Sequence, residues 1–144
     1  MRWVSSAEAI LFQERMVCNL GGLFGLLAHG KLESALVQPL AVVFDYEPFP
    51  TPALKVATLI DSLIKTHPFR DDNKRTAMRL GVALLEFNFP QKHTVSNDDI
   101  EAVAVGIAED TVTLEDVGHW LEEFMNVNGS RSTNTRGRSL PDAV

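Results

Sequence analysis

Residues 66–76 read THPFRDDNKRT and lie between two apolar runs of the chain. This stretch brings together one imidazole, two adjacent carboxylates, one amide and three basic side chains. Pro68 requires the helix before it to end near His67, because proline cannot continue a helix and restricts the residue that precedes it. A loop of this composition between two apolar helices is the first candidate for chemistry in this chain.

The apolar residues on either side of this loop recur at helical spacing along most of the chain. Such spacing predicts helices that each bury one face. The segment from Thr76 to Phe89 is apolar on several faces, so we expect it to be buried in the middle of a bundle. Without a repeat or a strand pattern, the fold class is predicted to be all-α. The helices are expected behind Ser5, over 31–37, from Pro52 to His67, over 76–89, and behind Ser96 and Thr113.

Two segments of the chain lack a helical pattern. Residues 41–52 contain three prolines and three aromatic residues, which predicts a short extended flap or loop. The chain from Asn128 onward is polar with almost nothing apolar, which predicts a flexible tail. We therefore expect one domain over residues 1–127 and a tail over residues 128–144.

The composition is that of an ordinary globular chain, with 45% hydrophobic and 22% charged residues. A net charge of −6 argues against nucleic-acid binding, which needs a broad basic surface. No apolar run approaches the ~18 residues of a membrane span and no signal peptide is apparent, so we expect a cytoplasmic protein without a membrane partner. The single cysteine, Cys18, is expected to be a buried apolar filler, as suits a reducing compartment.

The charge around the quoted loop contrasts with the acidic chain as a whole. Between His67 and Arg79 the sequence has four basic residues and two acidic ones. The loop also leads into the N terminus of the expected buried helix, where free backbone N–H groups and the helix dipole attract anions. Arg75 and Arg79 share one helix face and Lys74 points about 100° away, so they can grip a phosphate chain from two sides.

Two further side chains make this a candidate site for phosphorus chemistry. Asp71 offers a hard oxygen ligand of the type that Mg²⁺ accepts together with substrate phosphates. His67 can accept a proton near neutral pH. A base, a metal ligand and a phosphate clamp together predict transfer of a phosphorus group to a hydroxyl.

Each of these residues also has a purely structural interpretation. His67 can be a capping residue, and either Asp71 or Asp72 can be the N-cap of the following helix. The basic side chains can form a solvated helix face. The compact spacing of the cluster, more than any single residue, favours the functional interpretation.

The stretch HPFRDDNKRTA, residues 67–77, resembles the motif H-x-F-x-D-G-N-G-R-x-x-R of the Fic/Doc family. Its N-K-R is similar to the death-on-curing (Doc) toxin branch, and so are GKLESALVQPL at 30–40 and ALLEFNF at 83–89. The resemblance covers roughly residues 1–127. It implies a Fic/Doc-like helical bundle with the motif loop at a nucleotide site, and transfer of AMP or phosphate from ATP to a protein hydroxyl.

The resemblance implies a role for each matching residue of the loop. His67 would be the general base toward the target hydroxyl, Phe69 would anchor the loop in the core, and Asp71 would hold Mg²⁺. Residues 41–49 would form a flap that aligns the target segment by strand-like pairing. ATP and Mg²⁺ are therefore the expected substrate and cofactor.

The resemblance places the phosphates at the start of the following helix. Asn73 and neighbouring backbone amides would form an anion pocket, and Lys74 and Arg75 would bind phosphates. Asp72 stands in the same pocket, where the family has glycine or alanine. A carboxylate there would disfavour a triphosphate by about 1 to 4 kcal/mol, unless Mg²⁺ lies between them or the side chain points to solvent.

The second arginine of the motif falls at Met78, and Arg79 lies one residue, or about 100°, away. The Doc branch shares this departure, and the resemblance implies that this branch transfers the γ-phosphate of ATP. We therefore expect a Doc-like toxin that phosphorylates a Ser or Thr of a translation protein, for which the resemblance suggests elongation factor Tu. The alternatives are a protein adenylyltransferase, and a nucleotide- or partner-binding module silenced by Asp72.

Members of the family are restrained by an inhibitory glutamate, supplied in cis or by a partner. TVTLED at 111–116 comes closest to the cis pattern, but it ends in Asp and is explained as the start of an amphipathic helix. A separately encoded antitoxin is therefore the expected partner.

Overall fold

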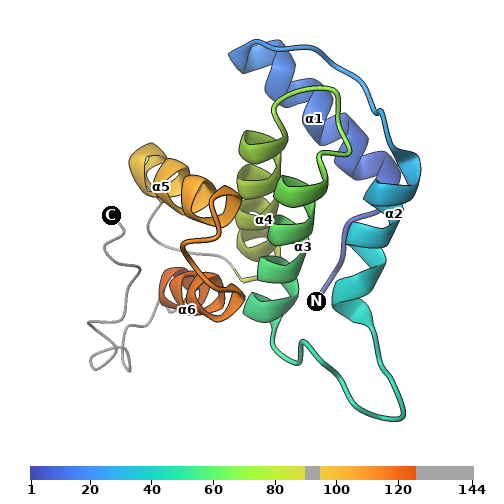
Figure 1. The fold of residues 1–144 in the computed structure, drawn as a ribbon, viewed down its shortest axis with the longest axis vertical. Helices are drawn as coiled ribbons and strands as arrows, with labels where there is room; N and C mark the ends of the chain where they lie inside the picture. Colours follow the sequence, from blue (N-terminus) through green and yellow to red (C-terminus); the bar gives the residue numbers. More distant parts are fainter. Residues whose placement is uncertain (90–94, 126–144) are drawn as a thin grey trace.

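The computed structural model describes residues 1–89 and 95–125 of the chain. Within these ranges the protein is all-α, with strand-like pairing limited to two isolated bridges, so the expected fold class is confirmed (Figure 1). The tail expected from Asn128 lies outside the described residues. The elements are α1 (Ser6–Leu20), α2 (His29–Val37), η1 (Gln38–Leu40), α3 (Pro52–Thr66), α4 (Asn73–Asn88), α5 (Asn97–Ala108) and α6 (Leu114–Met125).

Helices α3 and α4 form the centre of the bundle (Figure 1). α3 contacts α2, η1, α4, α5 and α6, while α4 contacts α1, α3, α5 and α6. Both helices bury residues on several faces, which confirms the expectation that 76–89 lies inside the bundle. Among the described helices, none is both long and apolar enough to cross a membrane.

Three helices begin at the caps that the sequence predicts, whereas α2 and α4 start two and three residues before the expected positions and have no side-chain cap. Ser5 and Glu8 form a capping box, in which Glu8 N donates to Ser5 Oγ (3.1 Å) and Ser5 N donates to Glu8 Oε1 (2.9 Å). Ser96 caps α5, and Thr113 and Asp116 exchange the same pair of bonds before α6. Each cap satisfies N–H groups that the first turn of a helix leaves unpaired, so these boundaries follow from local sequence.

The prediction that Cys18 is buried is wrong, because its side chain is exposed. The buried face of α1 consists of Ala9, Gln13 and Met16, which are spaced by four and three residues. Cys18 comes two residues after Met16, so it points to the opposite side of the helix. A polar residue, Gln13, occupies the position on the buried face where an apolar side chain is expected.

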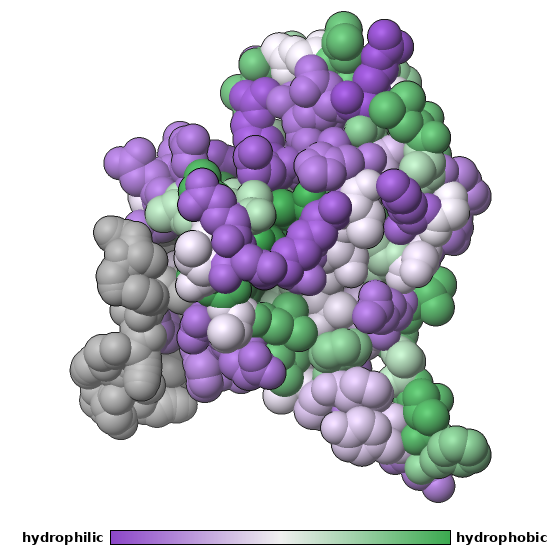
Figure 2. Space-filling view, in the orientation of Figure 1, coloured by the Kyte–Doolittle hydropathy of each residue, from purple (hydrophilic) through white to green (hydrophobic). Residues whose placement is uncertain are grey.

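The segment between α2 and α3 is the loop that the prolines and aromatic residues predict. Val43 and Tyr46 exchange two backbone hydrogen bonds of 2.8 Å across a tight turn. Phe44 and Asp45 have positive φ angles of 51° and 65°, as this kind of two-residue turn requires. Phe44 is 98% exposed, and the segment forms the apolar projection at the lower right of Figure 2.

This flap segment lies at the N-terminal end of α3, whereas residues 67–72 follow the C-terminal end of the same helix (Figure 1). A helix of this length separates the two by roughly 20 Å. The resemblance implied that the flap aligns a target at residues 67–72. The flap segment lies too far from these residues for that role (Figure 1).

Gly81 allows α3 and α4 to approach closely. A Cβ at Gly81 would lie 2.5 Å from Ile60 Cδ1 and 3.0 Å from Val56 Cγ1, and both neighbours are fully buried. The side chains of a packed core cannot move aside at no cost. The close contact of these two helices sets the position of the loop that joins them.

We expect Gly81→Ala to lower the free energy of unfolding by about 1–3 kcal/mol, because the added methyl group overpacks the α3–α4 contact. The control is Gly30→Ala in α2, where no atom lies within 4 Å of the new Cβ. Gly30→Ala should leave stability unchanged or slightly higher, since alanine is the better helix former. Urea denaturation measures both, and equal effects would contradict the packing argument.

Candidate active site

The loop of residues 67–72, here the motif loop, is fastened to the start of α4 by the Asn73 side chain. Asn73 Oδ1 accepts a hydrogen bond from Phe69 N (2.9 Å), and Asn73 Nδ2 donates to Phe69 O (3.0 Å). Phe69 itself is 1% exposed and lies in the hydrophobic core. The side-chain amide of Asn73 therefore bonds within the motif loop, and the backbone N–H of Asn73 remains available to bind an anion.

His67 terminates α3 in a left-handed conformation with φ of 52°. Its backbone N–H donates to Leu63 O (3.3 Å), so the structural interpretation as a capping residue holds for the backbone. The side chain is exposed, and it has no hydrogen-bond partner within the residues that the structure describes. The imidazole thus remains available for proton transfer.

Residues 21–25, here the glycine loop, run beside the motif loop. Arg70 N donates to Gly25 O (2.8 Å), and Leu26 and Phe69 form an antiparallel bridge. Gly22 has a φ of 115°, and a Cβ there would lie 2.6 Å from Asp72 Oδ2. Only glycine fits this close approach.

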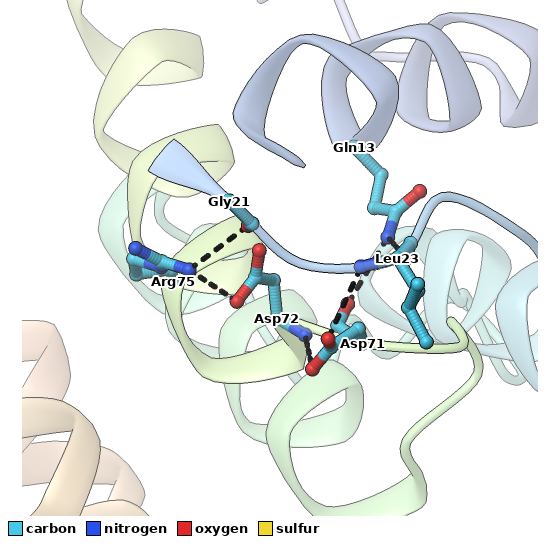
Figure 3. Close-up of polar contacts among 6 residues, drawn as sticks. All are labelled: Gln13, Gly21, Leu23, Asp71, Asp72 and Arg75. Atoms are coloured by element: carbon cyan, nitrogen blue, oxygen red, sulfur yellow. Dashed lines mark hydrogen bonds and ion pairs between the residues drawn. The ribbon is translucent and has the colours of Figure 1, made fainter. Parts of the chain in front are cut away.

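The Gln13 side chain of α1 points toward both loops and links them (Figure 3). Its Nε2 donates to Leu23 O (3.2 Å) and to Asp71 O (3.1 Å), and its Oε1 accepts from Gly25 N (3.3 Å). The residue is fully buried. Sequence reasoning missed it, although a glutamine on the apolar face of a helix is the pattern that could have revealed it.

Asp71, the predicted metal ligand, also bonds to both loops. Its Oδ2 accepts from Leu23 N (3.1 Å) and its Oδ1 accepts from Asp72 N (2.9 Å). A carboxylate has about four acceptor positions, so these two bonds leave room for a cation. No cluster of three or more acidic, histidine or cysteine residues that could hold a metal occurs in residues 1–89 and 95–125. Asp71 fits an Mg²⁺ that is bound mainly through phosphates and water.

Asp72 takes the N-cap position of α4 in a left-handed conformation, with φ of 60°. Its side chain makes no capping hydrogen bond, so the structural interpretation as a capping residue is wrong for its carboxylate. Instead, Oδ1 pairs with Arg75 Nη2, which also donates to Gly21 O (3.4 Å) (Figure 3). Oδ2 is buried and has no hydrogen-bond partner among residues 1–89 and 95–125. Arg75, the predicted phosphate ligand, is thus already paired within the protein.

A cavity of about 750 Å³ opens at the N terminus of α4. This volume lies within the range of small-molecule sites, roughly 300–1,000 Å³. α5 forms the opposite wall through Asn97, Ile100 and Glu101, none of which the sequence analysis singled out. Most of the predicted site residues line this one cavity, with Phe69 packed in the core: His67, Asp71, Asp72, Asn73, Lys74 and Arg75.

The cavity presents several unpaired donors. The backbone N–H groups of Asn73, Lys74 and Arg75 have no acceptor among the described residues, as is usual for the first turn of a helix. The Lys74 side chain is exposed and has no partner there either. Arg79 also lines the cavity and bonds to Asn97 of α5, whereas Met78 is fully buried. These donors can bind phosphate oxygens.

Replacing Gln13 with methionine should lower the free energy of unfolding by about 1–3 kcal/mol, because three backbone groups of the two loops would lose their partner. The matched control is Gln38→Met, since Gln38 is exposed on η1 and its side chain makes no hydrogen bond there. Urea denaturation measures stability. Equal stability of both variants would refute a linking role for Gln13.

Comparison with known proteins agrees with this geometry. The family model described as "Fic/DOC family" matches residues 3–85, which include the glycine loop, the motif loop and most of α4. A protein named "Toxin Doc" from Mycolicibacterium smegmatis is 34% identical over 68 residues, which cover 47% of this chain and 52% of that protein. This chain therefore spans about half the length of that relative. The extent of the family match, more than half of the chain, shows that the protein belongs to the Fic/DOC family.

Proposed function

We propose that this protein is a Doc-like toxin that transfers the γ-phosphate of ATP to a serine or threonine hydroxyl of a translation protein. The observation that carries the proposal is the position of the free His67 imidazole on the same cavity as the open N terminus of α4. A base and an anion site must share one cavity for a nucleotide phosphate to meet a hydroxyl.

The residues of the cavity divide between binding and proton transfer. The N–H groups of Asn73 to Arg75 and the Lys74 ammonium bind the phosphate chain. His67 takes the proton of the target hydroxyl, whose oxygen forms a bond to the γ-phosphorus. The bond from that phosphorus to the β–γ bridging oxygen breaks, and ADP leaves with its electron pair. His67 then releases the proton to water.

Asp71 is the residue that would hold Mg²⁺ in this proposal. When bound, the ion neutralises part of the charge on the phosphate oxygens. The fit rests on the acceptor positions that the bonds to Leu23 N and Asp72 N leave open.

Transfer of phosphate is favoured over transfer of AMP by the position of Met78. The second arginine of the family motif falls at this residue, which is fully buried and cannot reach a ligand. Arg79 lines the cavity but is bonded to Asn97. The cavity therefore lacks the second motif arginine, a departure that it shares with the Doc branch.

A second candidate function is a silenced nucleotide- or partner-binding module. The pairing of Asp72 with Arg75 favours it, because this arginine is held by an internal carboxylate in place of a phosphate.

For the leading function, we propose that the protein acts in the cytoplasm and that elongation factor Tu is the first target to test. We also propose that a separately encoded antitoxin restrains the protein. The name of the M. smegmatis relative supports the toxin assignment.

The test uses ATP labelled on the α- or the γ-phosphate, a cell extract and purified elongation factor Tu. We expect γ-label on protein, and His67→Ala should reduce it by about 10²- to 10⁴-fold, as loss of a general base does. His119→Ala is the matched control, because this exposed histidine of α6 lies outside the cavity and is expected to leave labelling unchanged. Transfer of the α-label would support adenylylation, and the absence of any His67-dependent label would leave only the binding module.

A further inference from the structure

The Asp72 carboxylate is a fixed negative charge within the cavity wall. Its side chain is 10% exposed, and Oδ2 is buried with no hydrogen-bond partner in the described residues. Oδ1 is held by Arg75, and the backbone of Gly22 lies directly against Oδ2. The side chain therefore points into the cavity wall and not into solvent, which was one of the two ways for it to avoid a triphosphate.

The same carboxylate lies beside the N–H groups of α4 without using them. An aspartate at an N-cap normally accepts a hydrogen bond from the second or third residue of the helix. The left-handed backbone of Asp72 and its pairing with Arg75 direct the carboxylate elsewhere. The anion site at the helix terminus thus stays open, but it has a negative charge next to it and an arginine that is already neutralised.

Arg75 compensates part of this charge, and the remaining charged groups around the cavity are of both signs. Arg70, Lys74, Arg75 and Arg79 line the cavity with positive charge, and Asp71, Asp72 and Glu101 line it with negative charge. Arg75 is paired with Asp72 and Arg79 is bonded to Asn97. Asp71 adds a second carboxylate next to Asp72, since both have an oxygen within 3.2 Å of the Cβ position of Gly22.

We infer that Asp72 is a specificity-determining residue that makes this cavity discriminate against phosphates without a divalent cation. A bare diphosphate meets the Asp72 charge at short range, where salt screens it poorly. A bound Mg²⁺ cancels most of the ligand charge and removes most of this repulsion. This inference rests on the proposed nucleotide site and concerns which ionic form of the nucleotide that site accepts.

The variant that tests the inference is Asp72→Asn. Asparagine has nearly the shape of aspartate and tolerates the left-handed conformation, so the substitution removes the charge and keeps the backbone. Asp72→Gly is the second variant, because glycine adopts this conformation freely. Asp110→Asn is the matched control: Asp110 is also left-handed, with φ of 61°, bonds to Lys65 (2.8 Å) and lies outside the cavity.

The measurement is isothermal titration calorimetry with ADP and with inorganic pyrophosphate, each with Mg²⁺ and with EDTA. For the native protein we expect Mg²⁺ to raise the affinity for ADP by at least about tenfold. Asp72→Asn and Asp72→Gly should raise the affinity for metal-free ADP and pyrophosphate by about tenfold, and that for the magnesium complexes by less than about threefold. Asp110→Asn should change none of these values.

The outcomes separate this inference from the proposed function. If both Asp72 variants bind ADP with the same dependence on Mg²⁺ as the native protein, the inference is wrong and the nucleotide site stands. If neither the native protein nor the variants bind ADP with or without Mg²⁺, both the inference and the proposed function are wrong. Thermal denaturation of each variant confirms that a change in affinity does not come from loss of the fold.

Discussion

The geometry of this protein depends on buried amide side chains that hold two loops together. Asn73 closes the motif loop onto α4 through both of its polar groups, and Gln13 joins the motif loop to the glycine loop through three hydrogen bonds. Both residues are buried, where an unpaired polar group is costly. These bonds fix His67 and the start of α4 on the same cavity, so that a base and an anion site face the same space.

Asp72 differs from the residue of the family motif at this position, and the motif loop and the glycine loop accommodate it. The position has a left-handed backbone, which glycine adopts freely and which aspartate, unlike most other residues, also tolerates. Gly22 leaves space for the carboxylate and Arg75 neutralises part of its charge. The result is a candidate site whose electrostatics differ from those that the family motif implies.

Local sequence predicted the features that depend on neighbouring residues. The caps at Ser5, Ser96 and Thr113 and the end of α3 before Pro68 all follow from side chains a few positions apart. The pairing of the glycine loop with the motif loop joins residues far apart in the chain, such as Gly25 and Arg70, and no local pattern encodes it. The α5 wall was missed for the same reason, and the flap was assigned to the site although α3 separates the two.

The most direct test of this account is a ¹H–¹⁵N NMR titration of the full chain with ADP and Mg²⁺. The account predicts that the backbone amides of Asn73, Lys74 and Arg75 and the ring nitrogens of His67 shift together, while buried residues of α6 such as Leu121 do not. A saturating response at those amides would place the phosphates at the N terminus of α4. Binding that leaves them unchanged and shifts residues elsewhere would contradict the account.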